Sequence, residues 1–182
     1  FLARHAGLHI LTLGIDDTDA VLARLRRAWG CMPDVSYTHR AVDDADKEGV
    51  QARFALITPP DRPAGRVHLI RHEKPEALWQ PRFLRHPNKV AAWEEIVLVA
   101  PEPAVSAAWY SVLAGRPLVP DAWGGFTLVL PRGRIRIVPG PLQNAPAPPC
   151  FAALTLRTSD GTGALRALLE ARALEHAVTD DC

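Results

Sequence analysis

Three stretches of this chain repeat one plan, and that repetition limits the fold more than any other feature. They cover residues 8–30, 95–115 and 151–174. Each opens with an apolar run of strand length, continues through a short polar or proline-containing link, and ends in an amphipathic helical pattern. One such unit cannot bury its own apolar face, so we expect the units to pack against one another.

The helical part of each stretch carries start and stop signals. Asp17 or Thr18 can cap the first helix, because a side-chain oxygen there accepts from a free N–H of the opening turn. Gly30 follows as a stop. The predicted buried stripes are Val21, Leu22, Leu25, Ala28 and Trp29 in the first helix; Ala104, Ala108, Trp109 and Val112, ended by Gly115, in the second; and Leu165, Leu168, Leu169 and Leu174, capped by Ser159 or Asp160, in the third.

Strand-like segments follow the first two helices. They cover 50–58 and 66–72 after the first helix, and 125–131 and 134–140 after the second, where Arg132 and Gly133 form a tight turn. No helical pattern occurs between 116 and 150, which argues against a doubly wound α/β sheet. We therefore predict an α+β fold of repeated βαβββ modules, with antiparallel-rich curved sheets and helices on the outer face.

The module boundaries follow from this pattern. A first module spans 1–92 and ends in a long arm, 71–92; a second spans 93–148; an incomplete third, strand plus helix, spans 149–182.

Composition excludes several classes of partner. A formal net charge of +1 gives no sign of a nucleic-acid or anionic-membrane partner. No apolar run approaches the roughly 18 residues of a membrane span. The cysteines at 31, 150 and 182 lie far apart without a CxxC pair, which favours reduced thiols and a cytoplasmic location.

This arrangement resembles the vicinal-oxygen-chelate superfamily, which includes glyoxalase I, extradiol dioxygenases and bleomycin-resistance proteins. The opening FLARHAGLHILTLGIDD resembles the linker and first strand that begin a second module there. The arm RHEKPEALWQPRFLRHPN is similar to a segment of the glyoxalase-like domain proteins. The resemblance implies that a module precedes Phe1 and that further strands follow Cys182.

The resemblance also implies a divalent metal (Mn, Fe, Ni or Zn) held by His and Glu side chains from the first and last strands of paired modules. The first-strand ligand positions fall on Ile10, Glu95 and Ala153, of which Glu95 alone can bind a metal. His9 points at the helix layer in this register, and His72 ends the last strand of the first module. The weak metal candidates are thus His9, His72 and Glu95, without a complete site.

The arm concentrates the candidate substrate-binding residues, which are Arg71, His72, Trp79, Arg82 and His86. A tryptophan can act as a platform, and an arginine can grip an acid. The alternative is structural: Trp79 plugs the core, while the polar side chains satisfy a backbone broken by prolines.

Two functions lead at this stage, and a third interpretation is a structural or dimerising protein with a degenerate cleft. One is a metal-dependent isomerase, lyase or dioxygenase acting on a small oxygenated acid. The other is a non-enzymatic module that binds a small molecule without metal, which Ile10 and Ala153 at ligand positions favour. Unfinished sheets leave unpaired edges, so the clefts close either within the chain or by pairing with a second copy as a homodimer.

Overall fold

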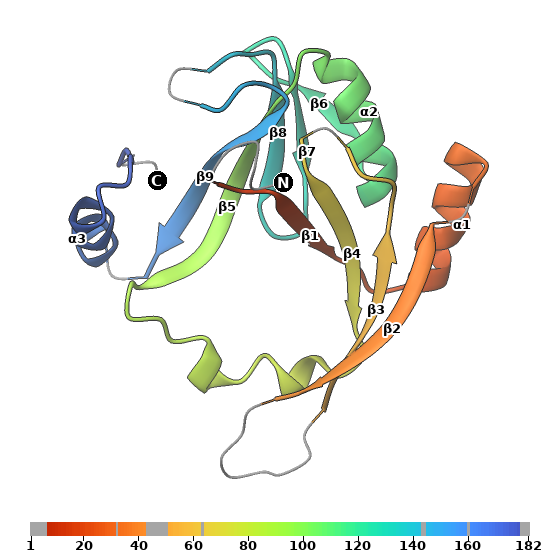
Figure 1. The fold of residues 1–182 in the computed structure, drawn as a ribbon, viewed down its shortest axis with the longest axis horizontal. Coiled ribbons are helices and arrows are strands. Elements are labelled where there is room, and N and C mark those ends of the chain that lie inside the picture. Colours follow the sequence, from red (N-terminus) through yellow and green to blue (C-terminus); the bar gives the residue numbers. More distant parts are fainter. Residues whose placement is uncertain are drawn as a thin grey trace.

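The computed structural model describes residues 7–31, 33–42, 51–62, 64–142, 145–159 and 161–178. In this part of the chain, two mixed sheets are accompanied by three α-helices (Figure 1). The predicted α+β class with open, antiparallel-rich sheets is confirmed.

The first sheet is built from one βαβββ unit. Its elements are β1 (Ile10–Gly14), α1 (Thr18–Trp29), β2 (Asp34–Ala41), β3 (Gln51–Thr58) and β4 (Arg66–His72). The spatial strand order is β1-β4-β3-β2, with β1 parallel to β4 and the other pairs antiparallel.

The second unit has the same plan. It consists of β5 (Val90–Val99), α2 (Pro103–Ala114), β6 (Leu118–Pro120), β7 (Phe126–Val129) and β8 (Arg134–Val138). These strands lie in the order β6-β7-β8-β5, with β5 parallel to β8, so β5 is the counterpart of β1.

A third unit begins with β9 (Cys150–Thr158) and α3 (Gly163–Ala171). β9 adds to the free edge of β5 in antiparallel fashion. The β5–β9 pairing slips at three places, one of them between Trp93 and Glu95, where Glu94 is the additional residue.

The arm between β4 and β5 contains two short 3₁₀ turns, η1 (Pro75–Ala77) and η2 (Pro81–Phe83). It runs across the lower side of the molecule and joins the two sheets (Figure 1). Ala77 is buried, whereas η2 buries no side chain.

The first helix forms as its sequence predicts, except that Ala28 of the predicted buried stripe is exposed. The Asp17 carboxylate accepts from the Ala20 N–H at 3.0 Å, and Gly30 ends the helix in the left-handed region at φ 69°. Val21 and Leu25 are buried against the sheet. Capping and apolar spacing therefore determine both the ends and the buried face of α1.

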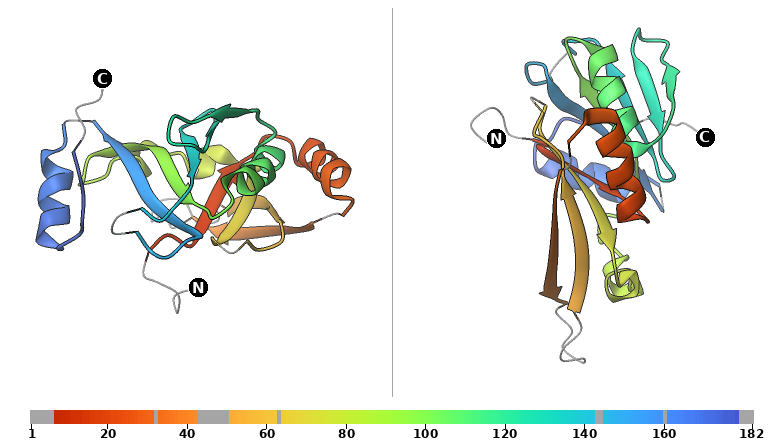
Figure 2. Two further views of the ribbon diagram at one scale, coloured as in Figure 1. Left: turned by 90° about the horizontal axis from the view of Figure 1, so that it is seen from above. Right: turned by 90° about the vertical axis from the view of Figure 1, so that its right-hand side faces the viewer.

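Helices α1 and α2 pack side by side on the outer side of the sheets (Figure 2). The indole rings of Trp29 and Trp109 stack with centroids 5.7 Å apart. The Arg24 guanidinium donates to the backbone oxygens of Val112 and Leu113, at 2.8 and 2.7 Å. One hydrophobic cluster contains residues of both units, so the first two units share a core.

Several details differ from the sequence expectation. The buried residues of α2 are Ala107, Trp109, Tyr110 and Leu113, and Val112 packs half-buried against the core. The predicted stripe was therefore wrong at Ala104 and Ala108, which are exposed. α3 begins after Thr162 without a side-chain cap, not at Ser159; Asp160 lies outside the described residues. α3 buries none of its described side chains. Strands β2 and β6 were not predicted.

None of the described helices is long and apolar enough to span a membrane.

Candidate functional site

The first strand divides its side chains between two faces. Leu11 and Leu13 are buried in the core beneath α1, whereas the Ile10 residue is 52% exposed on the opposite face. The predicted register of β1, with Ile10 turned away from the helix layer, is confirmed.

A hollow of about 680 Å³ lies beside this face, between β1, the arm and the β5–β9 pair. Its size falls within the range of small-molecule pockets, roughly 300–1,000 Å³. Apolar side chains form most of its wall, and Thr12 and His86 are its polar ones. The lining residues are Leu8, Ile10, Leu11, Thr12, Trp79, Leu84, His86, Val90, Ala91, Ala92, Trp93, Ile96, Leu154 and Leu156.

Two of the predicted substrate-binding residues, Trp79 and His86, line this hollow. His72 lies behind Trp79. The centroid of its ring is 6.1 Å from that of Trp79 and 5.1 Å from that of Phe54. Its Nδ1 is buried and has no hydrogen-bond partner among the residues that the structure describes. Burial lowers the pKa of His72 below its ordinary value, which favours a neutral ring that supports Trp79.

Arg71 and Arg82 lie apart from this group. Arg71 is exposed, and its place in β4 turns it to the face opposite His72. The Arg82 Nε donates to Gln80 at 3.0 Å, and its guanidinium lies 4.5 Å from the Phe83 ring centre. Neither arginine lines the hollow.

The candidate metal ligands are also separated. The His9 backbone oxygen accepts from the Arg66 N–H at 2.9 Å, which fixes His9 beside the start of β4. His72 ends β4, about 20 Å along the strand at roughly 3.3 Å per residue. One metal ion cannot contact both imidazoles.

Glu95 lies on the face of the second sheet that α2 does not cover. Its side chain is 5% exposed and is paired with two arginines of β8. One oxygen accepts from Arg134 Nε, and the other accepts from Arg136 Nη2 at 2.7 Å. The hydrogen bond and charge of Glu95 raise the pKa of Arg134 above its ordinary value.

The sequence of residues 1–114 matches the family described as the glyoxalase-like domain. This match covers more than half of the chain. The chain belongs to that family.

One solved structure agrees with this fold. The glyoxalase-like chain is similar to a hypothetical protein from Staphylococcus aureus, with a TM-score of 0.59, 12% identity and 83% of this chain covered. It spans 57% of the length of that protein. A second similarity is to a protein from Bacillus halodurans described as a putative glyoxalase, with 15% identity over 77% of this chain and all of that one. Its TM-score of 0.32 is too low to support an argument about the fold. No curated protein sequence matches.

The described residues of this glyoxalase-like domain do not fit the metal centre that the resemblance implies. Ile10 and Glu95 occupy equivalent positions, because Ile10 opens the β1–β4 ladder and Glu95 opens the β5–β8 ladder. Ile10 and Glu95 each lie eight residues before the first residue of the helix that follows. The same spacing before Gly163, the first residue of α3, places the third ligand position at Thr155 instead of Ala153. Isoleucine has no donor atom, and both Glu95 oxygens are engaged by guanidinium groups. Among the described residues, no group of three His, Cys, Asp or Glu side chains could hold a metal.

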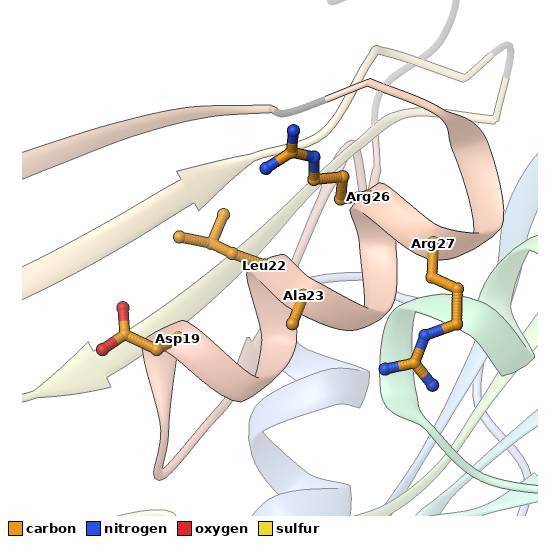
Figure 3. Close-up of a pocket in the computed structure, with 5 residues that line it drawn as sticks. All are labelled: Asp19, Leu22, Ala23, Arg26 and Arg27. Atoms are coloured by element: carbon orange, nitrogen blue, oxygen red, sulfur yellow. The ribbon is translucent and has the colours of Figure 1, made fainter.

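A smaller hollow of about 440 Å³ runs along the outer side of α1 in the glyoxalase-like domain (Figure 3). Its lining comes from one helix alone: Asp19, Leu22, Ala23, Arg26 and Arg27. Its charged side chains are exposed and diverge from one another (Figure 3). These features are typical of a solvated helix face rather than a binding site.

The sequence did not identify the floor of the larger hollow. Trp93, Leu154 and Leu156 come from β5 and β9, whose pairing brings them together. The exposed Leu154 and Leu156 alternate along β9. This alternation indicates one face of a strand, but it does not indicate a binding site.

Proposed function

We propose that this glyoxalase-like domain binds a small, mainly apolar molecule with a planar ring in the hollow between β1, the arm and the β5–β9 pair. The observation that carries the proposal is that large apolar side chains from three separate segments surround one concave region and remain exposed there. Trp79 is 52% exposed and Ile10 is 52% exposed.

The energetics favour an apolar occupant. Water at this wall contacts aliphatic and indole surface, and each Å² of apolar surface removed from water contributes about 25 cal/mol. A ligand that covers about 200 Å² of this wall would gain roughly 5 kcal/mol before the entropy of association is subtracted. Because roughly 5 kcal/mol corresponds to a Kd of about 0.2 mM even before that subtraction, we expect millimolar affinity.

Two features give the hollow some selectivity. The indoles of Trp79 and Trp93 offer flat surfaces on which a planar ring can stack. The Thr12 hydroxyl and the His86 imidazole can hydrogen-bond one polar substituent. We therefore expect a monocyclic or bicyclic aromatic molecule with a single hydroxyl or amine to bind better than a charged acid.

The metal-dependent isomerase, lyase or dioxygenase activity stays a prediction. The family membership supports this activity in general terms, but the side chains at the two ligand positions, Ile10 and Glu95, do not. The proposed binding in the hollow requires no metal.

Titration with indole, followed by ligand-observed NMR, tests the proposal. We expect Trp79→Ala to weaken indole binding about tenfold, because stacking on one indole face contributes about 1–1.5 kcal/mol. Tyr37→Ala is the control, since Tyr37 is an aromatic residue that is 72% exposed and lies outside the hollow. Equal loss in both variants, or unchanged binding in Trp79→Ala, contradicts the proposal.

A second measurement addresses the metal. The protein is incubated with Mn, Fe, Ni or Zn, dialysed, analysed for bound metal and titrated again with indole. We expect unchanged indole affinity. Stoichiometric metal that is required for indole binding would overturn the metal-free proposal.

A further inference from the structure

The Glu95 carboxylate organises two guanidinium groups on the face of the second sheet opposite α2. In the parallel β5–β8 ladder, Glu95 pairs with Arg134 and Val97 with Arg136, so both arginines flank the buried acid. The Arg134 side chain is 57% exposed, and Arg136 is partly exposed. None of these three residues lines the apolar hollow.

This cluster has more hydrogen-bond donors than acceptors. Each Glu95 oxygen already accepts from one arginine. The nearby Asp121 oxygens accept from the Trp123 N–H at 2.8 Å and the Thr127 hydroxyl at 3.1 Å. A guanidinium group carries five N–H donors, so most of the ten donors here remain after Glu95 has been satisfied. Within the described part of the chain, the buried Nε of Arg136 has no hydrogen-bond partner.

An exposed aromatic ring adjoins these donors. The Arg136 guanidinium lies 5.7 Å from the Trp123 ring centre, and Trp123 is 69% exposed. An indole that stacks on a guanidinium with its other face in solvent offers a platform beside a cation. The opposing strand adds the exposed Thr155, which pairs with Glu95.

We propose that Glu95, Arg134, Arg136 and Trp123 form a binding site for a planar carboxylate, at the position where the family resemblance expects a metal ligand. The arginines bind the oxyanion, Trp123 stacks on the planar group, and Glu95 is a positioning residue that holds both guanidinium groups on one side of the sheet. A carboxylate matches the guanidinium fork with two parallel hydrogen bonds.

The charges around this site determine the affinity for an anion that we expect. Asp121 opposes the binding of an anion, while its oxygens are engaged by its own loop. Glu94 is paired with Arg157 at 2.7 Å. Partly exposed arginines in water bind a single carboxylate weakly, so we expect millimolar affinity that falls as salt concentration rises.

Calorimetric titration of the whole chain with benzoate tests the site. In the Trp79→Ala variant, whose hollow is weakened, we expect benzoate to bind and benzamide, its neutral planar analogue, to bind at least tenfold more weakly. Arg134→Gln should weaken benzoate binding about tenfold, as expected for the loss of a charge-assisted hydrogen-bond pair. Arg157→Gln is the matched control: it removes the same charge from a side chain that is 59% exposed, and it should change the affinity by less than about twofold.

Other outcomes overturn the proposal. Equal binding of benzamide would mean that stacking alone acts, and equal loss in both arginine variants would mean that general surface charge acts. Inorganic phosphate that displaces benzoate at equal concentration would show an oxyanion site without selection for a planar group. Arg134→Lys guards against misfolding, because it keeps the charge that pairs with Glu95; retained folding with a smaller loss of affinity is expected. Trp79→Ala should leave benzoate binding unchanged, which separates this site from the hollow.

Discussion

Replacing Arg24 with methionine should uncouple the two packed helices. The last four carbonyls of a helix have no partner within it. In α2 the backbone oxygens of Val112 and Leu113 are satisfied by the Arg24 guanidinium, at 2.8 and 2.7 Å. Methionine keeps most of the aliphatic packing of the side chain while removing both donors.

The expected loss of stability follows from these two bonds. A hydrogen bond to a charged group contributes about 1.5–3 kcal/mol, and water can partly replace the donor at this half-buried site. We therefore expect the free energy of unfolding to fall by about 3 kcal/mol. With a urea m-value of about 2 kcal/mol/M, the unfolding midpoint would fall by about 1.5 M.

Urea unfolding followed by tryptophan fluorescence measures this shift, since Trp29 and Trp109 stack at the same interface. Arg27→Met is the control, because Arg27 is exposed on the same helix (Figure 3) and should cost under about 0.5 kcal/mol. A midpoint within 0.2 M of the wild type in Arg24→Met, or an equal shift in Arg27→Met, would refute the reasoning.

Two further perturbations test other parts of the structure. Burial depresses the pKa of His72, so below its ordinary value of 6.5 the unfolded chain takes up the proton first; stability should be full above that pH and fall as pH is lowered. The drop in unfolding free energy between pH 7.5 and 5.5 should be smaller in His72→Gln, and an unchanged drop would contradict the assignment. Gly65→Ala should cost about 2 kcal/mol or more, because φ is 150° and a Cβ would lie 2.4 Å from the His9 oxygen. Gly14→Ala, whose Cβ would have nothing within 4 Å, should leave the melting temperature nearly unchanged.

The repeated plan of the fold was predictable because strand alternation and helix caps are local signals. α1 shows this, with Asp17 at one end and Gly30 at the other. The buried face of α2 was not predictable, since a helix apolar on nearly every side has no period that selects one face. β2 was missed because most of its side chains are exposed and polar, and backbone pairing with β3 is what forms it.

The candidate sites depend on contacts between distant segments. Trp79 and His86, which line the hollow, could be named as candidates because the arm gathers unusual residues in one place. The salt bridges of Glu95 were missed, although Arg134 and Arg136 were visible, because the parallel register of β5 and β8 had to be known first. The hollow needed the position of β9, which no local pattern gives.

The additional residue in β5 has a consequence for the hollow. In a regular strand, side chains three positions apart point to opposite sides of the sheet. Trp93 and Ile96 are three positions apart, yet both line the hollow, because the slip at Glu94 reverses the alternation between them. The apolar floor thus depends on where the strand slips as well as on which residues it contains. If the same residues formed a regular strand without this slip, Trp93 would point away from Ile96 with no change in the identity of either side chain.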